Sequence, residues 1–332
     1  MAKKAKESAE ERLIARYFRP LAKHPGAFGL ADDAAAIAPP AGCDLVLTTD
    51  GVIAGVHFLP DDAPRDVARK ALRMNLSDLA AKGAAPLGFL LSLALPVKTK
   101  ASWIAGFAAG LADDSEHYAC PLLGGDTDHT VGPIMASITA FGAVPRGKMV
   151  RRSTAKPGDV VVVTGTIGDA ALGVKLRRKK SLGKSWRLKP KMTSHLLRRY
   201  LLPEPRNALA EAVLHHASAA MDISDGLAGD LGKLCRASAV AATIDVMRVP
   251  LSEAAQAAIA SARDLWQTVL TGGDDYEIIL TLPPDRLSAF RAAAARAGIA
   301  ATEIGRIEKG EGARFECHGK PLAYKRASYS HF

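Results

Sequence analysis

The sequence predicts a protein of the α+β or α/β class with two domains. Strand-like apolar runs alternate with helical stretches along the chain, which favours layers of helices on sheets. The chain has 332 residues, of which 48% are hydrophobic and 23% are charged. A chain of that length can form a sizeable hydrophobic core, and it is long for a protein with only one core. A crossover with a Pro-Gly turn lies near the middle, so we expect an N-terminal domain at 1–148 and a C-terminal α/β domain at 149–332.

The first domain is expected to hold a mixed sheet with helices on one face. Pro64 can open a helix, because its missing N–H falls where no intrahelical bond forms. Gly83 can close the same helix. After an N-terminal helix the expected order is strand, helix, strand, helix, strand, strand. The elements are helices at 10–18, 64–82 and 102–118, and strands at 45–50, 86–95, 121–123 and 134–144.

The second domain is expected to be built around the valine run at 160–164. Near-continuous β-branched residues predict a central strand that is buried on both faces. A glycine turn at 165–170 then leads into a helix and resembles a phosphate cradle only weakly, since it matches no standard phosphate motif. Further helices are expected up to 216, at 227–237, from 250 and at 284–297, and further strands at 219–223, 240–246, 278–282 and 301–307.

Composition excludes several classes of protein. No apolar run reaches the roughly 18 residues that a membrane span needs. The basic start is not followed by an apolar signal core, so secretion is not expected. The four cysteines form neither a CxxC pair nor a zinc spacing. We therefore expect a reduced, cytoplasmic protein with incidental thiols and no membrane partner.

The formal net charge is +10, and much of the positive charge lies between residues 175 and 199. A strongly basic chain brings nucleic acid into consideration. The segment could be a basic loop beside an anionic nucleotide, or a solvated surface insertion. The second interpretation is favoured because runs of charge are usually exposed. A nucleic-acid partner is not expected, and the stretch at 177–191 has no assigned role.

The most informative stretch is a short β-type run that ends in Thr48-Thr49-Asp50-Gly51. Such a strand delivers oxygen ligands at its carboxyl end, and oxygen ligands suit Mg²⁺ better than zinc or copper. Clustered carboxylates would repel one another and raise their own pKa values unless divalent cations lay between them. Metal-bound phosphates are therefore the expected ligand. Similar acidic ends recur at Asp32-Asp33, Asn75 to Asp78, Gly124 to Thr127, Asp222 to Gly226 and Gly272 to Tyr276.

Single residues in these motifs also have ordinary structural explanations. A lone histidine such as His57 is more often structural than functional. Asn75 and Asp78 share one side of a helix, which could be an ordinary polar face. Asp222 and Asp225 straddle a strand-to-helix turn, where they can converge on a cation and the helix N–H groups can hold a phosphate. Phosphoryl transfer needs positioning more than a nucleophile, and no GxSxG or HExxH motif is present.

Taken together, the motifs resemble those of the thiamine-monophosphate kinase family. The resemblance implies ATP-dependent phosphorylation of thiamine monophosphate to thiamine diphosphate by direct in-line transfer. It also implies the two-domain fold of aminoimidazole ribonucleotide synthetase, a homodimer, and nucleotide binding and dimerisation in the first domain. The motifs that carry it are Asp32-Asp33-Ala34-Ala35, Thr48-Thr49-Asp50, Val56-His57-Phe58, Asn75-Leu76-Ser77-Asp78, Gly124-Gly125-Asp126-Thr127, the residues at 165–173, 221–227 and 272–277, and Tyr329-Ser330-His331-Phe332.

The resemblance also implies roles for individual residues. No protein group is expected to act as nucleophile or base, because an oxygen of the acceptor phosphate is already anionic. Several Mg²⁺ ions are the implied cofactor, with ATP as co-substrate. The implied metal ligands are Asp33, Thr48, Thr49, Asp50, Asp78, Asp126, Asp222 and Asp225; the implied ATP contacts are Gly125, Asp126, Arg152 and Ser224; and the implied substrate contacts are His57, Asp274 and Tyr329.

The sequence departs from the family pattern at two positions. Ala31 stands where glycine usually precedes the aspartate pair, and Asp274 stands where glutamate is also common. The alternative is another ATP-dependent synthetase of the same superfamily. A selenophosphate-type enzyme is disfavoured because no reactive Cys or Lys motif lies near the start, and a hydrogenase-maturation dehydratase would end in cysteine. A basic nucleic-acid-binding protein is a remote alternative.

Overall fold

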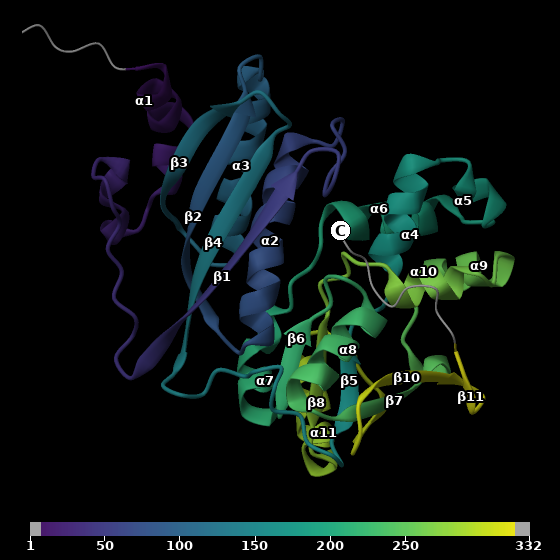
Figure 1. Ribbon diagram of the computed structural model, residues 1–332. Helices are drawn as coiled ribbons and strands as arrows, with labels where there is room; N and C mark the ends of the chain where they lie inside the picture. Colours follow the sequence, from purple (N-terminus) through teal and green to yellow (C-terminus); the bar gives the residue numbers. More distant parts are fainter. Residues whose placement is uncertain (1–7, 323–332) are drawn as a thin grey trace, which may run out of the picture. The chain divides into compact units, whose positions relative to one another are not determined.

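The computed structural model describes residues 8–322 (Figure 1). The chain forms two compact units, which are described separately. The first contains the chain up to Leu76 together with Pro86–Pro145, and the second contains Ser77–Ala85 and the chain from Arg146 onwards. The predicted domain limits of 1–148 and 149–332 stay a prediction, because the short segment Ser77–Ala85 groups with the second unit.

The first unit is a four-stranded sheet in the order β1-β4-β2-β3. β1 and β4 are antiparallel, whereas β2 and β3 are parallel, so the predicted mixed sheet is confirmed. Helices α2 and α3 cover one face of this sheet, as predicted (Figure 1). The bounds are β1 (Cys43–Ile53), α2 (Pro64–Ala81), β2 (Ala85–Pro96), α3 (Ala101–His117), β3 (Leu122–Thr130) and β4 (Met135–Pro145).

Side-chain alternation along β1 separates a buried face from an open one. Val46 and Val52 are buried, whereas Leu45 and Leu47 point to the other face and are 37% and 59% exposed. β1 is also an edge strand, since only β4 pairs with it. The chain therefore presents apolar side chains beside a strand edge that lacks a partner within residues 8–322.

The N-terminal segment packs as a series of short helical turns. These are α1 (Ala9–Leu13), a π-helical stretch η1 (Ile14–Phe18), and the 3₁₀ turns η2 (Arg19–Leu21) and η3 (Pro25–Leu30). Ser8 and Glu11 form a capping box at the start of α1, which satisfies two backbone N–H groups. The helix predicted at 10–18 is thus confirmed, with a wider last turn than expected.

The second unit is a seven-stranded sheet in the order β11-β10-β7-β9-β5-β8-β6. All five residues of β5 are buried, and its neighbours are β9 and β8. The predicted central valine strand is therefore confirmed, whereas the hairpin β10–β11 was not expected. The bounds are β5 (Val160–Thr164), β6 (Ala219–Asp222), β7 (Ala241–Asp245), β8 (Ile278–Leu282), β9 (Ala301–Glu308), β10 (Gly312–Cys317) and β11 (Lys320–Pro321).

The basic segment is helical rather than a loop. It contains α4 (Asp169–Arg178), α5 (Leu182–Ser185) and α6 (Pro190–Leu201), whose apolar side chains join the core of this unit. No helix in residues 8–322 is long and apolar enough to cross a bilayer. The other helices are η4 (Asn207–Leu209), α7 (Ala210–His216), α8 (Leu227–Ser238), η5 (Val246–Arg248), α9 (Glu253–Ser261), α10 (Leu265–Thr271), η6 (Pro284–Arg286) and α11 (Leu287–Arg296).

Candidate functional site

In the second unit, the acidic motif after β6 lies against the acidic motif before β8. The backbone N–H of Asp274 donates to the carbonyl of Ser224 at 2.9 Å, and Ile223 donates to the carbonyl of Glu277 at 2.8 Å. Gly273 permits this approach, because a Cβ there would lie 2.2 Å from the Ser224 oxygen. Two stretches fifty residues apart are thereby joined at one edge of the sheet. They bring together the predicted residues Asp222, Ser224, Asp225 and Asp274.

The loop before β8 is held in an unusual backbone conformation. Asp274 has φ 74° and Tyr276 has φ 50°, which is the left-handed region that non-glycine residues rarely adopt. The two N–H bonds from this loop to Ser224 and Ile223 fix it there, both at 2.9 Å. Local strain of this kind is common in ligand-binding loops. The conformation is compatible with the substrate contact predicted for Asp274, which stays a prediction.

Lys82, which the sequence reasoning did not select, lies among the predicted carboxylates of this unit. Its Nζ donates to the carbonyl of Ala220 at 2.8 Å, two residues before Asp222. Burial lowers the pKa of Lys82, the carboxylates of Asp222 and Asp78 oppose that shift, and Arg152 adds to it. Three predicted site residues therefore surround one ammonium group. The signal in the sequence was a lysine one turn after Asp78.

Asp225 has a competing cation. Lys233 forms an ion pair with Asp225 and a second one with Asp230 at 2.8 Å. The buried carboxylate of Asp230 also accepts the backbone N–H of Asp225 at 2.9 Å. Burial raises the pKa of Asp230, and its hydrogen bond and charge interaction with Lys233 oppose the rise. A metal ion at Asp225 would have to compete with this lysine.

Two acidic residues of the 272–277 motif have structural roles instead. Asp275 is completely buried and accepts the N–H groups of Gly168 at 2.7 Å and Ala170 at 3.4 Å. It thus caps the start of α4 from outside that helix. Its burial raises the pKa of this carboxyl well above the ordinary value, which the bond from Gly168 opposes.

The second of these residues, Glu277, is the centre of a buried ion-pair network. Its side chain is fully buried and forms ion pairs with Arg199 at 2.8 Å and with Arg206. The hydroxyl of Thr164, at the end of β5, donates to the same carboxylate at 2.7 Å. Arg199 closes the basic segment of the sequence, so this end of it has a structural role.

In the first unit, a cavity of about 800 Å³ lies on the open face of the sheet under the N-terminal segment. Phe18 and Leu30 form part of its apolar wall. Its lining includes the predicted residues Asp33, Gly125 and Asp126. A side chain could not replace Gly125, because a Cβ would lie 1.8 Å from the carbonyl oxygen of Leu91. An apolar hollow that is lined in part by acidic residues suits a flat organic group attached to metal-bound phosphates.

The motif at the end of the first expected strand lies inside β1 and not after it. Thr48 and Asp50 share the face of the buried valines, and Thr49 points to the open face. The Thr49 hydroxyl donates to the carbonyl of Ile138 at 3.2 Å and accepts from Thr139, which lines the cavity, at 3.1 Å. The three predicted ligands are therefore divided between both faces of the sheet.

Two anchors hold the polar residues of this region. The backbone N–H of Asp50 donates to the side-chain oxygen of Asn75 on α2 at 3.1 Å. The ring Nδ1 of His57 accepts the N–H of Ile53 at 3.0 Å, so the neutral ring carries its proton on Nε2. Lys70 also donates to the His57 carbonyl at 3.1 Å. Asp50 and His57 are thus each positioned by a hydrogen bond that involves a main-chain N–H group, whether or not a ligand is bound.

The predicted oxygen ligands suit a metal ion that takes most of its ligands from water and substrate phosphates. Among residues 8–322, no group of three or more His, Cys, Asp or Glu side chains is placed to hold a metal ion. A zinc site with protein ligands alone is therefore not formed by the described residues. Mg²⁺ commonly binds one or two carboxylates together with water and substrate phosphates. The scattered carboxylates and hydroxyls are suited to that mode of binding.

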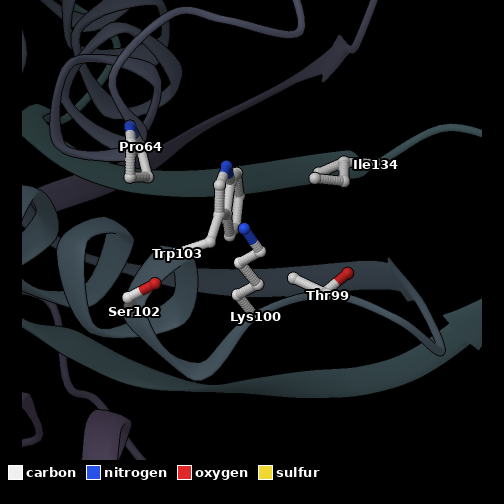
Figure 2. Close-up of a pocket in the computed structure, with 6 residues that line it drawn as sticks. All are labelled: Pro64, Thr99, Lys100, Ser102, Trp103 and Ile134. Atoms are coloured by element: carbon white, nitrogen blue, oxygen red, sulfur yellow. The ribbon is translucent and has the colours of Figure 1, made fainter.

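A smaller hollow of about 300 Å³ lies elsewhere in the first unit, at the starts of α2 and α3. Figure 2 shows Lys100 beside Trp103, with Pro64 and Ile134 nearby. Trp103 stacks on Phe107 at 5.2 Å between ring centroids. None of the predicted site residues lines this hollow, so the 800 Å³ cavity is the better candidate in this unit. Tyr329 lies outside the described residues.

Comparison with known proteins gives a consistent result over both units. Residues 31–144 match the family described as AIR synthase related protein, N-terminal domain, and residues 156–318 match its C-terminal domain. The thiamine-monophosphate kinase of Caulobacter vibrioides is 42% identical over 322 residues, which cover 96% of this chain and 89% of that protein.

Solved structures agree with the sequence match. The thiamine-monophosphate kinase of Stenotrophomonas maltophilia is 36% identical, with a TM-score of 0.82 over 94% of this chain and 96% of that one. AaThiL complexed with AMPPCP and TMP is 32% identical, with a TM-score of 0.76 over 92% and 97% of the two chains. The predicted two-domain fold of the aminoimidazole ribonucleotide synthetase type is therefore confirmed.

Proposed function

Because the chain belongs to the thiamine-monophosphate kinase family, we infer that it transfers the γ-phosphoryl group of ATP to thiamine monophosphate. The product is thiamine diphosphate. The complex of AaThiL with AMPPCP and TMP supports both substrates. Within the chain itself, the observation that carries the inference is the junction of the β6 and β8 motifs. It gathers carboxylates and a strained loop at one edge of the second unit.

We propose that transfer is direct and in line, with Mg²⁺ as the cofactor. When bound, Mg²⁺ neutralises phosphate charge, so that an anionic acceptor can approach an anionic donor. No residue of the chain has to act as a nucleophile or a base, because the acceptor oxygen is already anionic. In the first unit the proposed ligands are Asp33, Thr48, Thr49, Asp50 and Asp126, and in the second unit they are Asp78, Asp222 and Asp225.

The chain's own contacts prepare these residues for binding. Asn75 holds the backbone of Asp50 at 3.1 Å. Lys82 places a positive charge near Asp78 and Asp222, which reduces the repulsion between them while no metal is bound and competes with Mg²⁺ for the same carboxylates. The proposed ATP contacts are Gly125 and Asp126 in the lining of the cavity, and Arg152 and Ser224 in the second unit. The proposed contacts with thiamine monophosphate are His57, Asp274 and Tyr329.

The direct test is to incubate the purified full-length chain with ATP, Mg²⁺ and thiamine monophosphate and to quantify thiamine diphosphate. ATP-dependent product is expected, and none is expected with AMPPCP. A folded protein that hydrolyses ATP without forming thiamine diphosphate would point to another synthetase of the superfamily. Folding is checked in parallel by circular dichroism, so that an inactive preparation is recognised.

The variant Asp50→Asn tests the metal role of β1. Replacing the carboxylate removes a proposed Mg²⁺ ligand while the backbone bond to Asn75 remains, so kcat should fall by at least about 100-fold with little change in Tm. The matched control is Asp285→Asn, the same change at an exposed site outside the proposed ligands. Near-normal activity of Asp50→Asn across a Mg²⁺ titration would remove Asp50 from the ligand set.

We also propose that the protein is a cytoplasmic homodimer. The four cysteines are all free, as is usual in a reducing compartment. The long edge strand β1 carries Leu45 and Leu47 on its open face, and edges of this kind need a partner. Leu47→Glu should convert a dimer to a monomer in size-exclusion chromatography with light scattering. A monomeric parent, or a variant that stays dimeric, would contradict this interface.

A further inference from the structure

The basic residues of the second unit gather on one structural feature. We name residues 175–191 the basic tip: they are the last part of α4, the short helix α5 and the start of α6 (Figure 1). α5 lies close to both longer helices, since a Cβ at Gly183 would be 3.5 Å from Thr193 and 3.8 Å from Leu176. The segment is thus one folded surface and not an extended run of charge.

This surface accounts for the basic character of the whole chain. Residues 175–191 contain nine Lys and Arg and no Asp or Glu. The chain as a whole carries +10, so everything outside the basic tip sums to +1. Within the basic tip, the exposed side chains are Lys175, Arg178, Lys179, Lys180, Lys184, Arg187, Lys189 and Lys191. Among residues 8–322, none of these eight forms an ion pair.

Helix stability explains only part of this charge. Lys175, Arg177 and Arg178 lie in the last turn of α4, where positive charge is favourable to the helix dipole. Lys189 and Lys191 lie at the start of α6, where the same dipole disfavours them. That helix also lacks a side-chain cap and has no acidic residue in its first turn. An external anion would relieve this arrangement.

The exposed side chains of the tip favour binding to phosphate groups of nucleic acid over binding to a lipid surface. Peripheral helices bind membranes through exposed apolar side chains as well as charge. None of the large exposed apolar side chains of residues 8–322 lies in the tip. Its one aromatic residue, Trp186, is only 5% exposed and packs in the core. Base stacking is therefore not available either, which leaves contacts with the phosphate backbone.

In contrast to the expectation from the sequence that nucleic acid is not a partner, we propose that the basic tip binds the phosphate backbone of duplex nucleic acid without sequence specificity. This function is separate from the kinase activity, since no proposed metal, ATP or substrate residue lies within 175–191. Binding through phosphates alone is governed by the release of counterions and weakens steeply with salt. If the tip contacts about four phosphates, affinity should fall about 150-fold between 50 and 200 mM salt.

The test is fluorescence anisotropy with a short labelled duplex, performed with the full-length protein. Duplex DNA and duplex RNA are used in separate arms, and two unrelated sequences are compared in each. The test variant is Lys179→Gln, Lys180→Gln, Lys184→Gln and Lys191→Gln together. The matched control removes four exposed cations elsewhere: Lys98→Gln, Arg296→Gln, Lys309→Gln and Lys320→Gln. Both variants reduce the net charge equally, so they separate local from overall charge.

The tip variant should bind at least about tenfold more weakly and show a flatter salt dependence, while the control changes little. Both variants should retain the parent's kinase activity and Tm, because the substituted side chains are exposed. The proposal is overturned if the parent does not bind at 50 mM salt, or if the control loses as much affinity as the tip variant. It is also overturned if vesicles containing anionic lipid bind the tip more tightly than either duplex.

Discussion

Glu277 offers the sharpest test of how the second unit is held together. Glu277→Gln keeps the size of the side chain and removes its charge. The fully buried carboxylate forms ion pairs with Arg199 at 2.8 Å and with Arg206, and it accepts from Thr164 at 2.7 Å. The substitution leaves two arginines beside a neutral amide. Glu204, their other acidic neighbour, is 3.5 and 3.7 Å away and partly exposed.

The expected cost follows from the burial of the partners. Removing one member of a buried ion pair costs about 3–5 kcal/mol, because the other charge stays desolvated and unpaired. For a unit of this size, that lowers Tm by about 6–20 °C. Differential scanning calorimetry of the full chain measures the shift directly, and urea unfolding followed by circular dichroism provides an independent value.

A matched control separates this effect from the substitution itself. Glu308→Gln removes the same charge from an exposed pair with Arg314 at 3.1 Å, where the expected change is about 0–1 kcal/mol. If Glu277→Gln changed stability by no more than Glu308→Gln does, the ion-pair network around Glu277 would not be what stabilises the second unit. The Arg199 end of the basic segment would then need another explanation.

Two further predictions concern ionisable groups. Burial raises the pKa of Asp169, but hydrogen bonds, the first of them from His195, outweigh it and leave that pKa lowered. The ionised carboxylate therefore stabilises the fold at pH values above its unfolded-state pKa of 3.8, and this stabilisation is lost as pH falls through its folded-state pKa. Asp169→Asn should weaken the fall of Tm at acid pH in a pH series of thermal melts. An unchanged dependence of Tm on acid pH would refute the stabilising role of Asp169. Lys82→Met removes the cation near Asp78 and Asp222, so Mg²⁺ should bind about five-fold more tightly, or about 1 kcal/mol; calorimetric Mg²⁺ titration measures this, and weaker binding would show that Lys82 mainly orients these carboxylates.

The sequence predicted the regular parts of the fold because their signals are local. The valines of β5 and the Pro64 and Gly83 boundaries of α2 each specify an element without help from distant residues. The helices α5 and α6 were not predicted, because lysines lie between the apolar residues that pack in the core and make their helical periodicity hard to recognise. The edge hairpin β10–β11 was missed because two short strands carry little periodicity.

The candidate site was predictable in its chemistry but not in its geometry. Recurrent aspartates beside glycines pointed to oxygen ligands, and the structure joins two of those motifs in the second unit. Sequence spacing could not show that Asp275 caps α4 or that Glu277 pairs with arginines, because the residues in these contacts are 71 to 107 positions apart in the sequence. The surroundings of Lys82 were likewise not apparent, because Ala220, whose carbonyl accepts its hydrogen bond, is 138 residues away.

The open edge of β1 has a consequence for handling the protein. An apolar strand edge that is not paired can add strands from any neighbouring chain. Such addition joins two molecules, so association through the apolar edge that carries Leu45 and Leu47 becomes faster as the protein concentration rises. Losses on storage should therefore be greatest in concentrated solutions and smallest in dilute ones.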